Sequence, residues 1–436
     1  MPLEIDWFFS HVSWLHLLTV PVFTGVVGWL INWTGLVMLF SPVRFHGVTV
    51  PGMRQLSRVL PRKLQEVPGI LQGGIGWQGI VPARAAKMGS IAVDKAIAKL
   101  GTPREFYQQL DPEQIAEHIV EVFEPELPGM IEQIMLREHP ALWRDLPRPA
   151  RRAVVSRVQS QLPGVVGTVT QEIGEHIDQL LDPKIMVINR FESDPALVVR
   201  IFRDFGQREL NLMVAFGFVF GFVLGIPVAV VDHWFGLWWL LPVLGVVVGW
   251  ATNALGMWLI FEPPEPHRVL GVTVHGLFLR RQDEAAEVYA RIIADDVITL
   301  ENIGDFLLDG PRGDRTRQML AEAMRPAIDN AAGPVRGAVR VAMGSHRFDN
   351  IRDAVADEAV HRTIEPFRDP EFSRQQADKI NALIAVRTKE LPPRDFVEMM
   401  RSAIREDEWM LYAHGAIMGF AGGLLHLAIF GVGGAA

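Results

Sequence analysis

Four long stretches of this chain contain no Asp, Glu, Lys or Arg, and they constrain the fold more than any other feature. They run from Trp7 to Val43, from Asn211 to Val231, from His233 to Phe261 and from Trp409 to Ala436. Crossing the ~30 Å hydrocarbon core of a bilayer takes about 20 helical residues, so each stretch is long enough to hold such a helix. We therefore expect four transmembrane helices, at 17–40, 211–231, 236–261 and 410–432.

The rest of the chain has the charge of a water-exposed protein. Hydrophobic residues make up 49% of the sequence and charged residues 21%, which fits a chain that is partly in the membrane and partly in water. We expect two helical domains, domain A at 41–210 and domain B at 262–408. In domain A, Asp111, Pro112 and Gln114 predict the start of a capped helix. In domain B we expect helices at 355–364 and 380–404. The predicted fold class is mainly α.

The basic residues predict the orientation in the membrane. Residues 1–16 contain Glu4 and Asp6 but no Lys or Arg, whereas Arg44, Arg54, Arg58, Arg62 and Lys63 come after the first span. Basic loops stay on the cytoplasmic side. We expect segment 1–16 to be external and both domains to be cytoplasmic, in a bacterial inner membrane. The first apolar stretch exceeds the ~7–15 residues of a signal-peptide core, so we expect it to be retained.

The sequence contains an internal duplication. Gly28–Gly35 reads GWLINWTG and recurs as GWATNALG at Gly249–Gly256. GVTVPG at 47–52 returns as GVTVHG at 271–276. Three glycines spaced four apart precede the end of each half: Gly217, Gly221 and Gly225, then Gly415, Gly419 and Gly423. Matched blocks in the same order indicate two repeats. Each repeat crosses the membrane twice, so the repeats should be parallel.

Small and polar residues form the most specific signature within the predicted spans. Its members are Gly28, Trp29, Asn32 and Gly35, then Gly249, Trp250, Asn253 and Gly256. Each Gly, Asn and Gly set has the spacing i, i+4, i+7 and shares one helical face. An unpaired amide is costly in hydrocarbon, so each Asn should face protein. The Asn pair either cross-links the two repeats or lines a polar path. The two glycine ladders are typical of closely packed helices.

Two further motifs have weaker signals. Arg144, Arg148, Arg151 and Arg152 could contact anionic lipid headgroups, or form a solvated helix face. Gly74–Gly79 matches the GxGxxG pattern, but no apolar strand precedes it and Pro82 interrupts the segment after it. We expect a membrane-surface loop anchored by Trp77 instead of a dinucleotide site.

Several function classes receive no support from the sequence. The chain has no Cys, and none of the HExxH, GxSxG and P-loop motifs occurs. Its net charge of -8 gives no basic field for nucleic acid. We therefore expect no catalytic residue, no metal, no cofactor and no nucleic-acid partner.

Three motifs carry a family resemblance. They are the Gly-Trp-x-x-Asn block leading to Phe-x-Pro, the Gly-Ile-Val-Pro-Ala-Arg segment at 79–84, and Glu-Asp-Glu-Trp at 406–409. With them the chain resembles the bacterial membrane family known as domain of unknown function four-four-five, the YheB-like proteins. The resemblance spans nearly the whole chain and implies a membrane location without a reaction or cofactor. In the second repeat, Leu279 stands where the first has Pro82, although Arg281 still matches Arg84.

These observations favour a non-enzymatic, membrane-anchored scaffold. Its cytoplasmic domains would bind a protein partner, other copies of the chain or anionic phospholipids of the bilayer. The alternative is a transporter or channel whose polar path runs between the repeats past Asn32 and Asn253. Four spans are few for such a path, so the alternative requires an oligomer.

Overall fold

The computed structural model describes residues 14–430, except 54, 56–58, 62–64, 66, 72, 139, 270–271, 332–352, 355–357, 359, 361 and 363. Most of the predicted external segment 1–16 therefore lies outside the described residues. The same holds for the last two residues of the predicted helix 410–432 and for most of the predicted helix 355–364.

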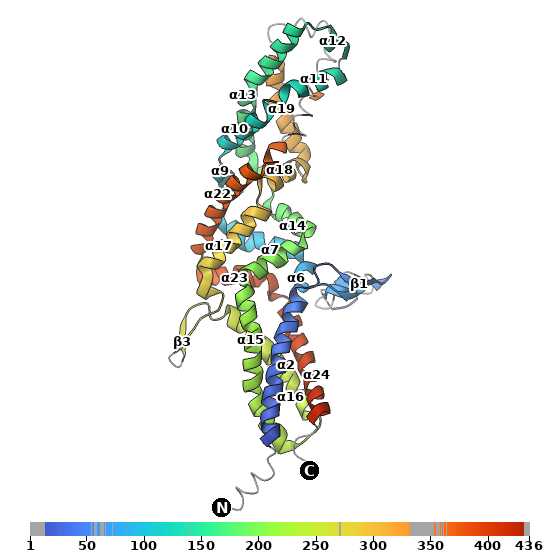
Figure 1. The fold of residues 1–436 in the computed structure, drawn as a ribbon, viewed down its shortest axis with the longest axis vertical. Helices are drawn as coiled ribbons and strands as arrows, with labels where there is room; N and C mark the ends of the chain where they lie inside the picture. Colours follow the sequence, from blue (N-terminus) through green and yellow to red (C-terminus); the bar gives the residue numbers. More distant parts are fainter. Residues whose placement is uncertain are drawn as a thin grey trace, which may run out of the picture. The chain divides into compact units, whose positions relative to one another are not determined.

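Within the described residues, four helices are long and apolar enough to cross a membrane. They are α2 (Trp14–Phe40), α15 (Pro195–Phe235), α16 (Leu240–Phe261) and α24 (Glu408–Phe430) (Figure 1). Their apolar spans are Leu18–Phe40, Gly206–Phe235, Leu240–Phe261 and Glu408–Phe430. The predicted mainly α fold with four membrane-spanning helices is confirmed.

The limits of two spans differ from those predicted. Helix α15 is far longer than 211–231, because Pro195 occupies its first turn and the charged residues after it do not interrupt a helix. Helix α16 begins at Leu240 and not at 236, because Gly236 adopts a left-handed conformation (φ 55°) that ends α15.

The remaining helices are short to medium in length, apart from one of 33 residues. Those before α15 are α5 (Pro68–Leu71), α6 (Ile80–Ala83), α7 (Ala85–Ala92), the π-helix η1 (Val93–Ile97), α8 (Ala98–Leu100), α9 (Pro103–Gln109), α10 (Pro112–Phe123), α11 (Leu127–Glu138), α12 (Pro140–Asp145), α13 (Arg148–Leu180) and α14 (Pro183–Ser193). Those after α16 are the 3₁₀ turn η2 (Leu279–Arg281), α17 (Gln282–Ile292), the π-helix η3 (Ile293–Val297), α18 (Leu300–Asp309), α19 (Gly313–Ala331), the 3₁₀ turn η5 (Glu365–Arg368), α22 (Pro370–Lys389) and α23 (Pro393–Arg405).

The helix starts agree with the local sequence. The Asp111 carboxylate accepts a hydrogen bond from the Gln114 backbone N–H at 3.3 Å, and α10 begins at Pro112 as predicted. The prediction of one helix at 380–404 is wrong. The chain breaks between α22 and α23, where Pro392 and Pro393 lack the backbone N–H groups that a continuous helix needs.

The chain divides into two compact units that cut across the predicted domains. The span unit contains the residues up to Ala96, Ile188–Tyr289 and the residues from Thr388 on; the helical unit contains Ile97–Val187 and Ala290–Arg387. In the helical unit, Val169 of predicted domain A packs in one core with Leu308 and Leu320 of predicted domain B. Domains A (41–210) and B (262–408) therefore do not form separate bodies in the structure.

In the span unit the four long helices pack as two intimate pairs. Helix α2 runs along α15 and α16 runs along α24, while α15–α16, α2–α24 and α2–α16 contacts join the pairs. Val20, Val228, Leu241 and Val248 form part of a shared core. The end of α15 and the turn into α16 expose an aromatic group made of Trp234, Phe235, Trp238 and Trp239; Trp favours a membrane–water interface.

Two antiparallel ribbons come after the opening spans. β1 (His46–Thr49) pairs with β2 (Gly74–Trp77) after α2, and β3 (His267–Val269) pairs with β4 (Val272–Val274) after α16. Segment Gly74–Gly79, predicted to be a loop, thus contains a strand. Its partner lies about 25 residues earlier in the chain, with no two-residue turn between them that could have signalled the pairing.

The duplication extends beyond the matched sequence blocks. Thr102 caps α9 and Thr299 caps α18, each by accepting a hydrogen bond from the backbone N–H three residues on. A π-helix precedes each cap, although α8 separates η1 from Thr102 and no such helix separates η3 from Thr299. These π-turns, which a period of 3.6 cannot reveal, show that both repeats retain the same local irregularity.

Candidate functional site

Each signature asparagine bonds to the backbone of the closing span in its own repeat. Asn32 Nδ2 donates to the Met213 carbonyl at 2.7 Å, and Asn253 Nδ2 donates to the Leu411 carbonyl at 2.5 Å. Both side chains are almost fully buried. The interpretation that the two asparagines cross-link the repeats is therefore wrong: each one ties α2 to α15 or α16 to α24. Asn32 Oδ1 has no hydrogen-bond partner within the described residues.

The glycine ladders make these bonds sterically possible. A Cβ on Gly217 would lie 2.7 Å from Asn32 Nδ2, and a Cβ on Gly415 would lie 2.6 Å from Asn253 Nδ2. Glycine at both positions opens the space through which each amide reaches a carbonyl four residues earlier. The sequence placed these residues on separate helices, and the structure brings them together as two equivalent sites.

The ladders also set how closely the helices approach. A Cβ on Gly28 would overlap the Gly217 carbonyl oxygen, and a Cβ on Gly249 would overlap the Gly415 carbonyl oxygen. The other ladder members meet backbone or Thr24 atoms of the opening spans: Gly221, Gly225, Gly419 and Gly423. The predicted packing role is thus realised within the chain, between the two spans of each repeat.

The other two signature glycines make looser contacts. A Cβ on Gly35 would be 3.5 Å from Leu411 Cδ2, which is ordinary contact. A Cβ on Gly256 would be 3.2 Å from the Met213 side chain and 3.7 Å from Asn32 Nδ2, so Gly256 lies beside the asparagine site of the first repeat. Trp29 and Trp250 are 43% and 51% exposed in the structure and lie on outward faces of α2 and α16. Two residues of each four-residue signature therefore build the interhelix site.

A small cavity lies within the span bundle. It has a volume of about 30 Å³ and lies among residues of all four spans, including Val20, Ile31, Val228, Val248 and Gly419. A cavity needs roughly 10–15 Å³ to hold one water molecule, so this space takes at most a water or two. Its lining is mainly apolar.

Two ion pairs that the sequence did not predict link the repeats, one fully buried and one partly exposed. Arg84 Nη1 lies 2.7 Å from Asp407 Oδ1, with side chains only 5% and 2% exposed. Arg281 Nη1 lies 3.1 Å from Glu209 Oε1. At the offset that relates Gly217 to Gly415, Glu209 corresponds to Asp407. Arg84 and Arg281, which occupy matched positions, thus each pair with an acid at the start of the closing span of the other repeat.

The neighbouring charges show the same crossed arrangement with opposite signs. Lys87 donates to Glu406, while at the equivalent positions Glu284 lies near Arg208. The hydrogen bond from Lys87 lowers the pKa of Glu406. The pKa of Glu284 is lowered by its hydrogen bond to Arg281 and, less strongly, by the charge of Arg208. A sequence comparison of the repeats by identity could not find these pairs, because the charges are exchanged.

Among the described residues, a further polar group of the second repeat has no counterpart in the first. Arg401 donates to both carboxylate oxygens of Glu408, at 2.8 and 3.2 Å, and to Glu262 at 3.1 Å. Tyr412 donates to Glu408 at 3.0 Å. The position equivalent to Glu408 in the first repeat is Leu210, so the two repeats differ in polarity where the closing span begins.

The basic stretch in the helical unit is only partly free for ligands. Arg151 donates to the Leu146 and Arg144 carbonyls and stacks over Trp143 at 5.6 Å. Arg144, Arg148 and Arg152 are exposed. Arg151 therefore shapes the turn from α12 into α13, and contact of the exposed arginines with headgroups stays a prediction.

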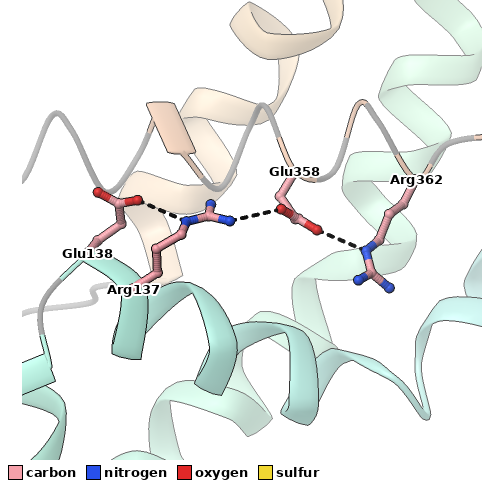
Figure 2. A network of polar contacts seen from close by, with 4 residues as sticks. All are labelled: Arg137, Glu138, Glu358 and Arg362. Carbon is pink, nitrogen blue, oxygen red and sulfur yellow. Dashed lines mark hydrogen bonds and ion pairs between the residues drawn. The ribbon is translucent and has the colours of Figure 1, made fainter.

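Within the helical unit, a charge network joins residues of predicted domain A to residues of predicted domain B (Figure 2). Arg137 donates to Glu138 at 3.1 Å and to Glu358 at 3.3 Å, and Arg362 donates to Glu358 at 3.0 Å. Glu358 is the shared acceptor. The hydrogen bonds from Arg362 and then Arg137 lower the pKa of Glu358 below its ordinary 4.5.

We expect this network to make the helical unit sensitive to acid. Because the folded-state pKa is lowered, the stabilisation is present above pH 4.5 and is lost as the pH falls through the folded pKa. Glu358→Gln should lower the free energy of unfolding at pH 7 by at most about 1 kcal/mol, and by less at pH 4. Thermal melting of the full chain at both pH values measures the difference. Glu132→Gln, an exposed substitution on α11, is the control; an equal loss there would contradict the role of Glu358.

Comparison with known proteins gives one partial similarity. The chain is 38% identical over 78 residues to a UPF0754 membrane protein of Shouchella clausii. The match covers 16% of this chain and 20% of that protein, so it spans about a fifth of the relative's length. No family model and no solved structure matches the chain. The four apolar helices and this similarity to a membrane protein together support a membrane location.

Proposed function

We propose that the chain is a non-enzymatic scaffold anchored by its four spans, with the helical unit available to bind a protein partner, another copy of the chain or anionic lipid. The observation that carries this proposal is the tight span bundle. Glycine backbones touch in both helix pairs, and both intramembrane asparagines bond to backbone carbonyls. Such a bundle is a fixed anchor.

The same contacts argue against a solute path within one chain. Asn32 and Asn253 each donate an amide N–H to a backbone carbonyl of the neighbouring helix, and the cavity among the spans is about 30 Å³. One unpaired Asn32 oxygen is too little to replace the hydration shell of an ion. A transporter or channel is therefore the alternative against which the scaffold is tested.

We also propose the finer placement of the protein. The excess of basic residues after the first span favours segment 1–16 outside and both long loops in the cytoplasm. The inner membrane of a bacterium is the membrane that fits this arrangement and the bacterial relative. The motifs at Gly28–Gly35, 79–84 and 406–409 support membership of the YheB-like family.

Substituting both asparagines tests the proposal. The double variant Asn32→Leu, Asn253→Leu should lose roughly 1 kcal/mol per site, the magnitude typical of interhelical hydrogen bonds in membranes. The full chain in detergent should melt at a lower temperature. Neither wild type nor variant should pass ions or small solutes when reconstituted in liposomes.

Thr34→Val is the matched control. Thr34 Oγ1 bonds to the Leu30 carbonyl of its own helix, so its loss should leave the melting temperature nearly unchanged. Solute flux through wild-type liposomes, abolished in the double variant while melting is unaffected, would establish the transporter and refute the scaffold.

A further inference from the structure

The ribbon β1–β2 has two chemically different faces. His46 pairs with Trp77 and Val48 with Ile75 in the antiparallel register. Because side chains alternate along a strand and directly opposed residues share a face, these four lie on one side. The other side carries Gly47, Thr49, Gly74 and Gly76. One face is thus apolar and aromatic, and the other is nearly bare backbone.

The protein covers part of the glycine face: Gly74 is buried, while Gly47, Thr49 and Gly76 stay exposed. A Cβ on Gly76 would lie 2.9 Å from the Phe45 ring, and a Cβ on Gly69 of α5 would lie 2.6 Å from the Gly76 carbonyl oxygen. Phe45 therefore packs against this face, and α5 contacts the Gly76 backbone. On the opposite face, Val48 and Ile75 are 72% and 70% exposed. A two-stranded ribbon alone is at most marginally stable in water, so a cover over this exposed pair would stabilise it.

The base of the ribbon is fixed to the end of the first span. The Gly79 N–H donates to the Pro42 carbonyl at 2.9 Å, and Gln78 Nε2 donates to the Val43 carbonyl at 2.8 Å. A Cβ on Gly79 would lie 2.7 Å from the Phe40 carbonyl carbon. The span Leu18–Phe40 has 23 residues, about 34 Å of helix, which matches the hydrocarbon thickness. The ribbon therefore leaves the bundle where acyl chains give way to headgroups, and projects from the span helices (Figure 1).

The sequence before and between the two strands carries a charge that favours an anionic surface. Arg44 is exposed immediately before β1. In the sequence, residues 41–65 contain five Lys or Arg and no Asp or Glu. Basic residues beside a span attract anionic headgroups, and an amphipathic surface with apolar residues on one side inserts at the headgroup–acyl boundary.

We propose that the β1–β2 ribbon is a membrane-interface arm whose Val48–Ile75 face seats in the lipid leaflet next to the end of α2, and that anionic lipid strengthens the seating. The arm binds a lipid surface and no soluble ligand. This inference needs the membrane location of the spans and not the scaffold role, so either can fail alone.

Single-cysteine labelling tests the arm, because the chain has no native Cys. Val48→Cys, Ile75→Cys and Thr49→Cys, each in the full chain, are labelled with a small fluorophore and placed in nanodiscs of phosphatidylcholine with or without phosphatidylglycerol. Lipid carrying a nitroxide high on its acyl chain should quench positions 48 and 75 about threefold more than position 49. The difference should grow when phosphatidylglycerol is present.

Ser193→Cys provides the reference for a site away from the bilayer. Ser193 ends α14 and is exposed, and roughly 17 Å of continuous helix separates Pro195 from the start of the apolar span at Gly206. Lipid quenching at 48 and 75 no stronger than at 193 would overturn the proposal. Protection of these labels from aqueous iodide without lipid quenching would overturn it as well, since a protein surface would then cover the face.

Discussion

Replacing Gly28 with leucine should disrupt the span bundle, with a loss of about 3 kcal/mol or more, at the upper end of what overpacking costs. Even the first added carbon overlaps the Gly217 carbonyl oxygen, and the next nearest atoms are also backbone. Backbone cannot move aside as a side chain does, so α2 and α15 must separate. Separation also stretches the Asn32–Met213 hydrogen bond. Thermal melting of the full chain in detergent, together with loss of the monodisperse species in size-exclusion chromatography, measures the effect.

Gly35 supplies the matched control on the same helix. It lies seven residues from Gly28, but a Cβ there would make ordinary contact with the Leu411 side chain. Gly35→Ala should change stability by less than about 1 kcal/mol, whereas Gly28→Ala should already cost roughly 1–3 kcal/mol. If the Gly28→Ala and Gly35→Ala variants had the same melting temperature, the close approach of the Gly28 and Gly217 backbones would not be what stabilises the bundle.

The sequence predicts the inner faces of the spans because helical periodicity is local. A spacing of four places Gly217, Gly221 and Gly225 on one stripe, and Asn32 must face protein in hydrocarbon. Periodicity does not say which helix lies opposite. Gly28 and Gly35 share a stripe, yet one meets the backbone of α15 and the other a side chain of α24. The prediction therefore gave the right packing type and the wrong partner for the asparagines.

The parts that could not be predicted depend on contacts between distant segments. β2 pairs with a strand about 25 residues earlier. The core of the helical unit contains residues of both predicted domains, A and B. Arg84 and Asp407 are more than 300 residues apart, and nothing local to either residue indicates burial. The alignment of the two repeats holds the relevant sequence signal. It matches Glu209 with Asp407 and Arg84 with Arg281, so a crossed pairing of the arginines with the acids could be put forward as a hypothesis from the sequence.

The two crossed pairs are equivalent in position but not in environment. Arg84 and Asp407 are both almost fully buried. Arg281 is 35% exposed and also bonds to Glu284, so it keeps a partner and water when Glu209 is neutralised. A charge left alone in a buried site costs far more than one that water can reach. The first pair should therefore dominate the coupling between the repeats.

Neutralising Asp407 should destabilise the full chain by about 3–5 kcal/mol, the usual cost of breaking a buried ion pair at one partner. Asp407→Asn leaves the Arg84 guanidinium buried without its carboxylate. The double variant Arg84→Met, Asp407→Leu should recover most of the loss, because it removes both charges and fills the space. Chemical denaturation in mixed micelles, analysed as a double-mutant cycle, gives the coupling energy.

Glu209→Gln is the control and should destabilise the chain clearly less than Asp407→Asn does. Additive effects of Arg84→Met and Asp407→Leu, or equal losses at Asp407 and Glu209, would show that the buried pair does not couple the repeats.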